Sequence, residues 1–584
     1  MFRRMKHRIK KVFAVLSVAT VASILAIGLQ GQPATTASYI VQGKSVAELR
    51  SLVAEFDAEI THELGVIRAI AADLTDDQVA ALRRHESVLR VYGNDPVTVA
   101  KKPGSDTSGG STTPGGSSSA TVDTHYPSLV GANEVHDMGI TGAGVGIAVL
   151  DTGLWKHSGI KADHLGNTRL DAVYNAMTDT VAQSPMSGDD PGGHGTHVAS
   201  IAVSSLLTSE GLYNGIAPGA HLISVQAFDE YGHGTYADVV RAIDWVIANR
   251  SRYKIRVLNL SFSAEARSHY WDDPINQAVM VAWQKEIFVV AAAGNAGPDA
   301  MTIGVPGNVP YVMTVGAMTD NFTPSDTSDD KLATFSSAGP TYEGFVKPDV
   351  VAPGGHMKGL VQGNSTLATT YPEFYADALY FEMSGTSQSA AVVSGIAALA
   401  LEAEAWRSVD ELKCKIISAA KPAVSGKGNK LSLTYSVFQQ GAGLVDAYAA
   451  VSNQNVDCAN NGLHIDNDID GFQHFGGRAN QEADGTYFLM GDLDTGESGY
   501  VWSNGYLWTD GTAWTNGYLW TDGYLWTNGY LWTDGTVGTN GYLWTDGVTM
   551  QGYLWTDGGL STNGYLWTDG GTEMASMSSW VNPE

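Results

Sequence analysis

The chain has 584 residues, of which 43% are hydrophobic, so it is long enough for several domains and a large core. Its formal net charge of −27 disfavours nucleic acid and anionic membranes as partners. The same acidity favours solubility outside the cell.

The first 37 residues have the pattern of a secretory signal peptide. Lys and Arg residues precede an apolar run at 12–29, and small residues at 35–37 offer a cleavage point. An uncleaved membrane anchor is the alternative, because a run of about 18 apolar residues can just span a bilayer. The run is rich in Ala, Ser and Thr, which favours the signal peptide. We therefore expect a secreted protein, with attachment to the cell surface left open.

Residues 38–100 are predicted to form a small α+β domain. Strands are expected at 38–41, within 59–74 and at 88–92, and helices at 45–56 and, capped by Thr75, at 76–84. This order is typical of a split βαβ sandwich. Residues 101–121 are Gly, Ser, Thr and Pro with almost nothing apolar, so they are predicted to be a flexible linker.

Residues 122–453 alternate between strand-like and helix-like patterns. Strands are predicted at 145–150, 222–226, 257–262 and 287–293, and helices at 194–207, 236–249, 273–286 and in the run after Ser387. This alternation predicts an α/β fold with a mostly parallel sheet and helices on both faces. Active sites in such sheets form at the carboxyl ends of the strands.

Three motifs in this region carry residues suited to nucleophilic catalysis. Asp151 ends an apolar run, His194 lies in a Gly-rich stretch, and Ser387 stands among small residues before a helix. A serine hydroxyl needs a base to take its proton, and the base needs a carboxylate to hold its tautomer. The triplet Gly-Thr-Ser alone is weak evidence for a nucleophilic serine, because most such triplets form turns or helix caps.

The three motifs, in the order Asp151, His194, Ser387, resemble those of the subtilisin-like serine proteases, or subtilases, over residues 122–453. The resemblance implies a subtilisin-like fold and peptide-bond hydrolysis through an acyl-enzyme. It also implies that Asn295, which alone would be taken for a turn former, donates to the oxyanion. The domain at 38–100 looks like the family's inhibitory propeptide, with an unrelated α+β domain as the alternative.

The resemblance further implies a substrate cleft. Gly304 would lie at the floor of the primary specificity pocket and leave room for a large apolar side chain before the scissile bond. Gln388 stands where relatives commonly have Met, which does not affect the proton transfer. The cleft residues carried over are Gly232, Gly234, Ser261, Phe262, Ser263, Ala293, Gly294 and Gly304.

No metal ligand set is expected, and the chemistry requires no cofactor, although a structural calcium ion is compatible with the resemblance. His197 follows His194 without the Glu of a metalloprotease motif, so it is predicted to pack locally. The segment 466–471 has the oxygen spacing of a calcium loop but lacks the final Glu, which favours a solvated turn. Pairing of Cys414 with Cys458 is left open.

An acidic connecting segment, 454–498, precedes a repeat array at 499–571 and a tail at 572–584. The array repeats Gly-Tyr-Leu-Trp-Thr-Asp/Asn with a full period of twelve residues, which predicts short strands joined by tight turns. Stacked copies would form a β-solenoid or a meander. The aromatic rings either bind a polysaccharide or cell-surface ligand or form the array's own core.

The predicted function is that of a secreted serine endopeptidase made as a precursor, with protein or peptide substrates and its own propeptide as inhibitor. The alternative is a weak or inactive subtilase-fold surface or adhesion protein that acts through the aromatic repeats.

Overall fold

A computed structural model of the chain describes residues 35–99, 123–185, 188–323, 326–376, 379–425, 432–481 and 485–489. It also gives the backbone of short strands between residues 502 and 568. The expected signal peptide, linker and C-terminal tail lie outside the described residues. The chain divides into two compact units, residues 1–94 and 95–584, which are considered separately.

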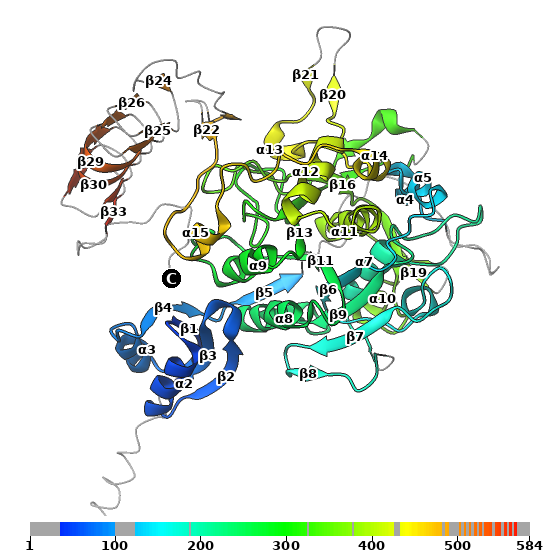
Figure 1. Cartoon of the computed structure of the whole chain (residues 1–584), viewed down its shortest axis with the longest axis horizontal. Helices are drawn as coiled ribbons and strands as arrows, with labels where there is room; N and C mark the ends of the chain where they lie inside the picture. Colours follow the sequence, from blue (N-terminus) through cyan, green and yellow to red (C-terminus); the bar gives the residue numbers. More distant parts are fainter. Residues whose placement is uncertain are drawn as a thin grey trace, which may run out of the picture. The chain divides into compact units, whose positions relative to one another are not determined.

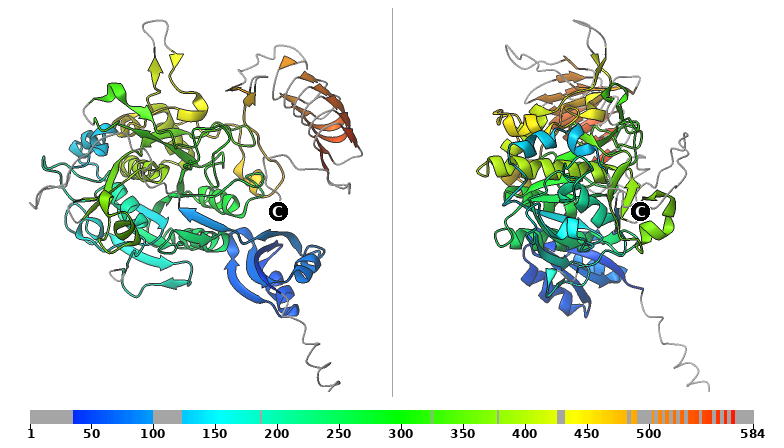
Figure 2. Two further views of the ribbon diagram at one scale, coloured as in Figure 1. Left: turned by 180° about the vertical axis from the view of Figure 1, so that it is seen from behind. Right: turned by 90° about the vertical axis from the view of Figure 1, so that its right-hand side faces the viewer.

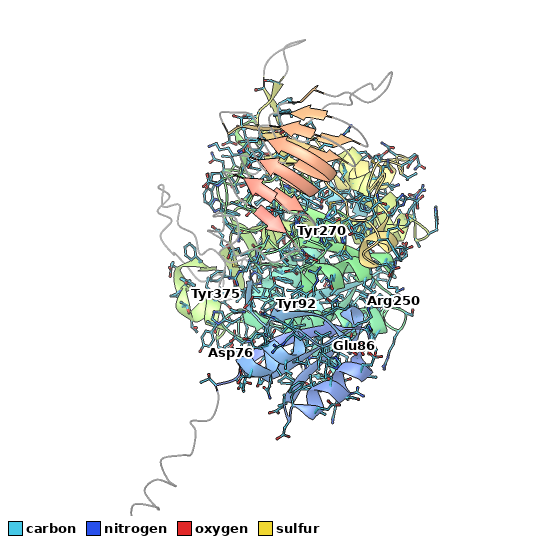
Figure 3. All side chains as sticks on the ribbon, turned by 90° about the vertical axis from the view of Figure 1, so that its left-hand side faces the viewer. Asp76, Glu86, Tyr92, Arg250, Tyr270 and Tyr375 are labelled. Carbon is cyan, nitrogen blue, oxygen red and sulfur yellow. A yellow bond between two sulfur atoms is a disulfide. The ribbon has the colours of Figure 1, made fainter. Side chains whose placement is uncertain are left out.

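The first unit is a four-stranded antiparallel sheet with two helices, in strand order β2-β3-β1-β4. Its elements are β1 (Ala37–Gly43), α2 (Val46–Glu55), β2 (Glu59–Leu64), η1 (Gly65–Ile67), β3 (Ala69–Leu74), α3 (Asp76–Leu82) and β4 (Val88–Gly93). Thr75 caps α3 and forms a capping box with Gln78. Figure 3 labels Asp76 at the start of α3 and Tyr92 on β4. The secondary structure predicted for 38–92 is therefore confirmed.

The second unit is built on a mostly parallel sheet. Within the described residues the sheet has nine strands, in the order β15-β14-β13-β11-β6-β9-β7-β8, with β16 beside β14. Only the β14–β15 and β7–β8 pairs are antiparallel. The strands are β6 (Gly146–Asp151), β7 (Leu170–Asn175), β8 (Thr180–Val181), β9 (His221–Gln226), β11 (Ile255–Leu260), β13 (Phe288–Ala292), β14 (Met313–Thr319), β15 (Lys331–Leu332) and β16 (Val350–Pro353).

Four long helices cover this sheet. α7 (His194–Val203) packs against α11 (Thr386–Ala403), and α8 (Tyr236–Asn249) packs against α9 (Pro274–Gln284). In Figure 1 the two pairs lie on opposite sides of β6 and β11. Because both faces are covered, β6 and β13 are buried along their whole length, which explains their continuous apolar sequences.

A strand that the sequence did not predict belongs to this second unit. β5 (Pro96–Val99) lies between β10 (His233–Thr235) and β12 (Phe262–Ser263) and pairs with both in antiparallel fashion. Val97 and Val99 are buried and Thr98 is exposed, so burial alternates along the strand as expected when one face is covered. The first domain, expected to extend to residue 100, therefore ends before β5.

A subdomain formed by residues 356–383 was also not predicted. Its elements are β17 (Met357–Leu360), α10 (Thr366–Thr370), η4 (Pro372–Phe374), β18 (Tyr375–Ala376) and β19 (Tyr380–Met383). Val361, Leu367 and Phe381 form a small core of their own. The backbone N–H groups of Thr366 and Leu367 donate to the carbonyls of Pro191 and Gly192, just before α7.

The remaining elements of the catalytic region are short apart from α12. They are α4 (Tyr126–Leu129), α5 (Ala132–Asp137), α6 (Ser158–Lys161), η3 (Thr327–Asp329), α12 (Val409–Ala419), β20 (Val424–Ser425), β21 (Ser432–Leu433), α13 (Val437–Gln440) and α14 (Ala447–Ser452). The two strands β20 and β21 pair with each other and stand out from the unit in Figure 2.

Residues 454–481 are fastened to the catalytic region. Cys414 on α12 and Cys458 form a disulfide with Cα atoms 5.1 Å apart. Asp468 on α15 (Ile465–Ile469) is 2% exposed and accepts hydrogen bonds from the hydroxyls of Tyr270, at 2.5 Å, and Tyr311, at 3.0 Å. Figure 3 labels Tyr270. The solvated turn expected at 466–471 is wrong, because a helix buries its central carboxylate.

After β22 (Ala479–Gln481) and β23 (Tyr487–Leu489), the repeat array contributes parallel strands. Equivalent residues pair in register along the backbone: Leu507 with Leu519, and Leu519 with Leu531. Parallel pairing at a twelve-residue period is the arrangement of a solenoid and not of an antiparallel meander. Whether the aromatic rings are exposed or form the array's own core stays open, because these side chains lie outside the described part of the chain. The strands are β24 (Trp502–Ser503), β25 (Leu507–Thr509), β26 (Ala513–Thr515), β27 (Leu519–Thr521), β28 (Leu525–Thr527), β29 (Leu531–Thr539), β30 (Leu543–Met550), β31 (Leu554–Thr556), β32 (Leu560–Thr562) and β33 (Leu566–Thr568).

Among the residues that the structure describes, no helix combines the length and the hydropathy needed to cross a bilayer.

Candidate active site

The structure brings the predicted acid and base into contact. Asp151 is the last residue of β6 and His194 the first of α7, and His194 Nδ1 lies 2.7 Å from Asp151 Oδ1. Both side chains are almost completely buried. The other ring nitrogen of His194, Nε2, is buried and has no hydrogen-bond partner among the described residues. The imidazole is thus oriented by the carboxylate and keeps a nitrogen available for a proton.

A second buried carboxylate, which sequence reasoning missed, holds the His194 helix in place. Asp190 accepts from the backbone N–H groups of Gly193 and Thr196, both at 2.8 Å, and from the hydroxyl of Thr152 at 2.8 Å. Thr152 directly follows Asp151, so Asp190 connects the loops that carry the acid and the base. Burial raises the pKa of the Asp190 carboxyl. The polar residues just before the His194 motif were the signal in the sequence that could have revealed Asp190.

Ser387 lies in the first turn of α11 and is fully buried. Its hydroxyl donates to the carbonyl of Ser261 at 3.0 Å, and the Ser261 hydroxyl donates back to the Ser387 carbonyl at 3.0 Å. Because His194 Nε2 has no hydrogen-bond partner among the described residues, a proton transfer from Ser387 to it would require the hydroxyl to rotate away from the Ser261 carbonyl. Catalytic hydrogen bonds commonly tighten only when substrate is bound.

Asn295 is oriented by its neighbour on α11. Its Oδ1 accepts from the backbone N–H of Thr386 at 3.0 Å and from the Thr386 hydroxyl at 2.9 Å. With the amide oxygen held by two donors, the amide NH₂ is directed away from Thr386. This is the orientation that an oxyanion donor needs, and Asn295 follows β13 and Gly294, at the carboxyl end of the sheet.

Strand β5 lies between β10 and β12, the two segments predicted to border the substrate cleft. Gly234 is aligned with Val97, and the Gly232 carbonyl accepts from the Val99 N–H at 3.1 Å. On the other side Phe262 is aligned with Val99 and Ser263 with Thr98. The predicted cleft residues Gly232, Gly234, Phe262 and Ser263 therefore line one extended peptide.

The expected pocket residues Ala293, Gly294 and Gly304 lie together, because the Gly304 N–H donates to the Ala293 carbonyl at 3.2 Å. The expectation that Gly304 leaves room at the pocket floor stays a prediction. A Cβ built on Gly304 would collide with the Ser263 Oγ, and one built on Gly294 would lie 3.0 Å from that same oxygen. Both glycines are thus packed tightly, with the Ala264 carbonyl beside Gly304 and the Ser337 hydroxyl beside Gly294 as further close neighbours.

His197 does more than pack locally on its own helix. Its Nε2 lies 3.0 Å from the carbonyl of Phe381, and its Nδ1 lies 3.4 Å from the amide nitrogen of Gln388. Burial lowers the pKa of His197 to about 3, so the ring is neutral near pH 7. Among the described residues, no group of three or more His, Cys, Asp or Glu side chains is arranged to hold a metal ion.

Comparisons with known proteins agree with this geometry. The serine protease AprX of Bacillus subtilis (strain 168) is 39% identical over 279 residues, which are 47% of this chain and 60% of the relative. Subtilisin J of Geobacillus stearothermophilus is 27% identical over 458 residues, which are 77% of this chain and 99% of the relative. This chain thus spans about three fifths of AprX.

Fervidolysin from Fervidobacterium pennivorans, described as a keratinolytic enzyme related to subtilisin, shares the fold. The crystal structure aligns with a TM-score of 0.52 and 20% identity, over 73% of this chain and 62% of that one. Residues 142–443, which include Asp151, His194, Asn295 and Ser387, match the Subtilase family. The match extends over more than half of the 584 residues, so this chain belongs to the subtilase family.

Proposed function

We propose that this chain is a secreted serine endopeptidase that hydrolyses peptide bonds through an acyl-enzyme. The observation that carries the proposal is the buried His194–Asp151 pair, 2.7 Å apart, with a buried Nε2 directed away from the carboxylate. In this geometry His194 can take a proton from Ser387 and return it to a leaving amine. No cofactor enters the proposal, because these side chains supply both the nucleophile and the proton transfers.

The proposed reaction begins when the Ser387 Oγ attacks the scissile carbonyl carbon and its proton moves to His194 Nε2. Asp151 stabilises the resulting imidazolium. The negative oxygen of the tetrahedral intermediate is held by the amide NH₂ of Asn295 and the backbone N–H of Ser387, which lies in the first turn of α11. Collapse of the intermediate transfers the proton to the leaving amine, and water then hydrolyses the acyl-enzyme by the same steps.

We further propose that residues 38–94 are an inhibitory propeptide and that β5 is its substrate-like end. Strand β5 supports this role, since it occupies the cleft in the register of a bound peptide. Ser261, which precedes β12, is hydrogen-bonded to Ser387, and Ala100 follows β5 in the sequence, which supports a cut just after Ala100. The first bond to be cut is therefore the one between Ala100 and Lys101.

A fluorophosphonate probe tests the activity directly, because it labels only an activated serine. The wild-type chain should be labelled and Ser387→Ala should not. Purified Ser387→Ala should also remain an uncut precursor, while the wild type yields a new N-terminus at Lys101, measured by mass spectrometry. Failure of the wild type to react would favour the alternative of an inactive surface protein.

The repeat array is proposed to retain the enzyme on a polysaccharide or on the cell surface. In-register parallel strands bring equivalent Trp residues of successive repeats to neighbouring positions, such as Trp508 and Trp520. Regularly spaced aromatic residues suit stacking on sugar rings. A chain ending at Leu489 should cut soluble peptides as fast as the full chain but should no longer sediment with insoluble cellulose, chitin or bacterial cell walls. Equal sedimentation of both chains would refute the retention role.

A further inference from the structure

A completely buried amide lies in the central sheet, next to the helix that carries the nucleophile. Asn259 is on β11, between the buried residues Leu258 and Leu260, where the surrounding sequence is apolar. Burying an amide costs free energy unless its polar atoms find hydrogen-bond partners. Side chains alternate along a strand, so Asn259 shares a face with Ser261, and both of these side chains reach residues of α11.

Asn259 belongs to a series of three hydrogen bonds that ends on the backbone of Ser387. The Ser394 hydroxyl donates to Asn259 Oδ1 at 2.9 Å, and Asn259 Nδ2 donates to the Ser261 Oγ at 2.8 Å. The Ser261 hydroxyl then donates to the Ser387 carbonyl at 3.0 Å. Ser387 and Ser394 are two turns apart on one face of α11. These four residues, all completely buried, are called the Asn259 network.

The direction of the hydrogen bonds in the Asn259 network is set by its last acceptor. A carbonyl oxygen only accepts, so the Ser261 hydroxyl has to donate to Ser387, which leaves the Ser261 oxygen as an acceptor. The NH₂ side of the Asn259 amide donates to that oxygen, and the amide oxygen is thereby turned toward Ser394. A carboxylate of the same shape at position 259 would have no proton to offer Ser261.

The Asn259 network holds the residue that has two roles in the proposed reaction. The Ser387 hydroxyl is the proposed nucleophile, and the Ser387 N–H is a proposed oxyanion donor. The hydroxyl donates to the Ser261 carbonyl at 3.0 Å, and that bond has to break before the attack. The bond from the Ser261 hydroxyl to the Ser387 carbonyl can persist meanwhile, so the backbone stays in place while the side chain rotates.

We propose that Asn259 is a positioning residue, which acts through Ser261 to hold the backbone of Ser387 where its hydroxyl can attack and its N–H can stabilise the oxyanion. Ser394 orients the Asn259 amide from the other side. The inference deepens the proposed function and rests on it. Because Asn259 acts on the nucleophile and not on the cleft, its substitution should slow the reaction with every peptide and leave the choice among peptides unchanged.

The experiment uses full-length variants after complete maturation, with working sites counted by endpoint fluorophosphonate labelling. Substrates are chromogenic amides of Val-Thr-Val-Ala and Val-Thr-Val-Leu, based on residues 97–100. Asn259→Asp keeps the shape of the amide and removes its NH₂ donor. Its kcat per labelled site should fall about 10–100-fold, since a small misplacement of reacting groups costs up to about 10²-fold. KM and the preference between the two peptides should change less than about 2-fold.

Ser394→Ala tests the same network from its other end and buries no charge. It should lower kcat per site about 3–10-fold, because the amide loses the hydrogen bond that orients it. Added to Asn259→Asp, it should cost little more, since changes within one network are not additive. Ser389→Ala is the matched control, which removes another buried hydroxyl of α11, one that donates to the Ala352 carbonyl. It should leave kcat per site unchanged.

The proposal is overturned if Ser394→Ala or a folded Asn259→Asp keeps the wild-type kcat per site. An equal loss in Ser389→Ala also overturns it, because that result would indicate a general weakening of α11. If Asn259→Asp does not fold, Ser394→Ala and its control decide the question alone. Absence of labelling in the wild type would instead overturn the proposed activity itself.

Discussion

The proposed catalytic residues and the proposed walls of the substrate cleft are held in different ways. Asp151, His194 and Asn295 are each fixed by side-chain hydrogen bonds in a buried setting, with Asp190 and Thr386 as supports. Strands β10 and β12 contact β5 through backbone pairing, and their side chains that are half-buried or exposed, such as His233 and Ser263, are held less firmly. Changes in the first region should affect all substrates equally, and changes in the second should redistribute activity among substrates.

The largest expected effect comes from Asp151→Asn. The neutral amide can hold His194 in the wrong tautomer and cannot stabilise the imidazolium, so kcat should fall about 10⁴-fold for every substrate. Steady-state kinetics on Val-Thr-Val-Ala and Val-Thr-Val-Leu amides measures the loss. A loss that differs between the two peptides would break the proposed division between the regions.

A smaller uniform loss is expected for Asn295→Leu. Removal of one oxyanion donor should lower kcat about 10²–10³-fold and leave KM nearly unchanged, because the donor acts on the transition state. Thr386→Val is the matched variant, since it removes the hydroxyl that orients the Asn295 amide and keeps the backbone N–H. It should lose less than Asn295→Leu, and an equal or larger loss would contradict the assigned roles.

The support of the β10 wall should depend on pH. Asp273 caps α9 and accepts from the hydroxyl of Tyr236, the residue after β10, and burial raises its pKa to about 6. The folded state then binds a proton more tightly than the unfolded state. The stabilisation from that proton is complete below about pH 4 and is lost as pH rises through about 6.

Against an Asp273→Asn control, the free energy of unfolding should therefore fall by about 3 kcal/mol between pH 4 and pH 7. Urea unfolding of both chains in a Ser387→Ala background, which prevents self-digestion, measures this difference. Parallel pH profiles for the two chains would show that the Asp273 carboxyl is not perturbed.

The smallest expected effect lies at the outer end of the cleft. Arg267 Nη1 lies 3.3 Å from the Asp95 carboxylate, and the Asp95 carbonyl accepts from the Tyr236 N–H. Asp95 is the sixth residue before the proposed cut after Ala100. Both side chains of the ion pair are about half exposed, so the enzyme should favour a substrate with Asp over one with Asn at that position by only about 2–5-fold in kcat/KM. Arg267→Gln should abolish the preference. Arg252→Gln, three residues beyond the end of α8, is the control and should retain it.

Sequence patterns were sufficient to locate strands that are largely buried on both faces and a helix start with a clear capping residue. The apolar runs at β6, β9, β11 and β13 and the cap of α3 at Thr75 occurred close to the predicted positions. The three catalytic motifs were also visible, because nucleophile, base and carboxylate each demand a specific residue type with small neighbours.

Features that depend on contacts across the fold were not visible in the sequence. β5 has only four residues, and its two partners come from distant parts of the chain. Asp190 could not be distinguished from a turn residue until its four donors were in place. Ser263 was assigned to the pocket edge, but the direction of its hydroxyl toward Gly304 and Gly294 is a side-chain feature that no motif encodes.

The fastening of residues 454–481 determines how mechanical load can pass through the molecule. A pull on the chain beyond Leu489 reaches the catalytic sheet through a series of attachments: the paired strands β22 and β23, the buried Asp468 with its tyrosine hydroxyls, and then the covalent Cys414–Cys458 link. The hydrogen-bonded attachments yield first and the covalent link last. An enzyme tethered by its repeats to a moving or insoluble surface would therefore lose its outer contacts under tension before the load rests on the disulfide and on α12, which carries Cys414.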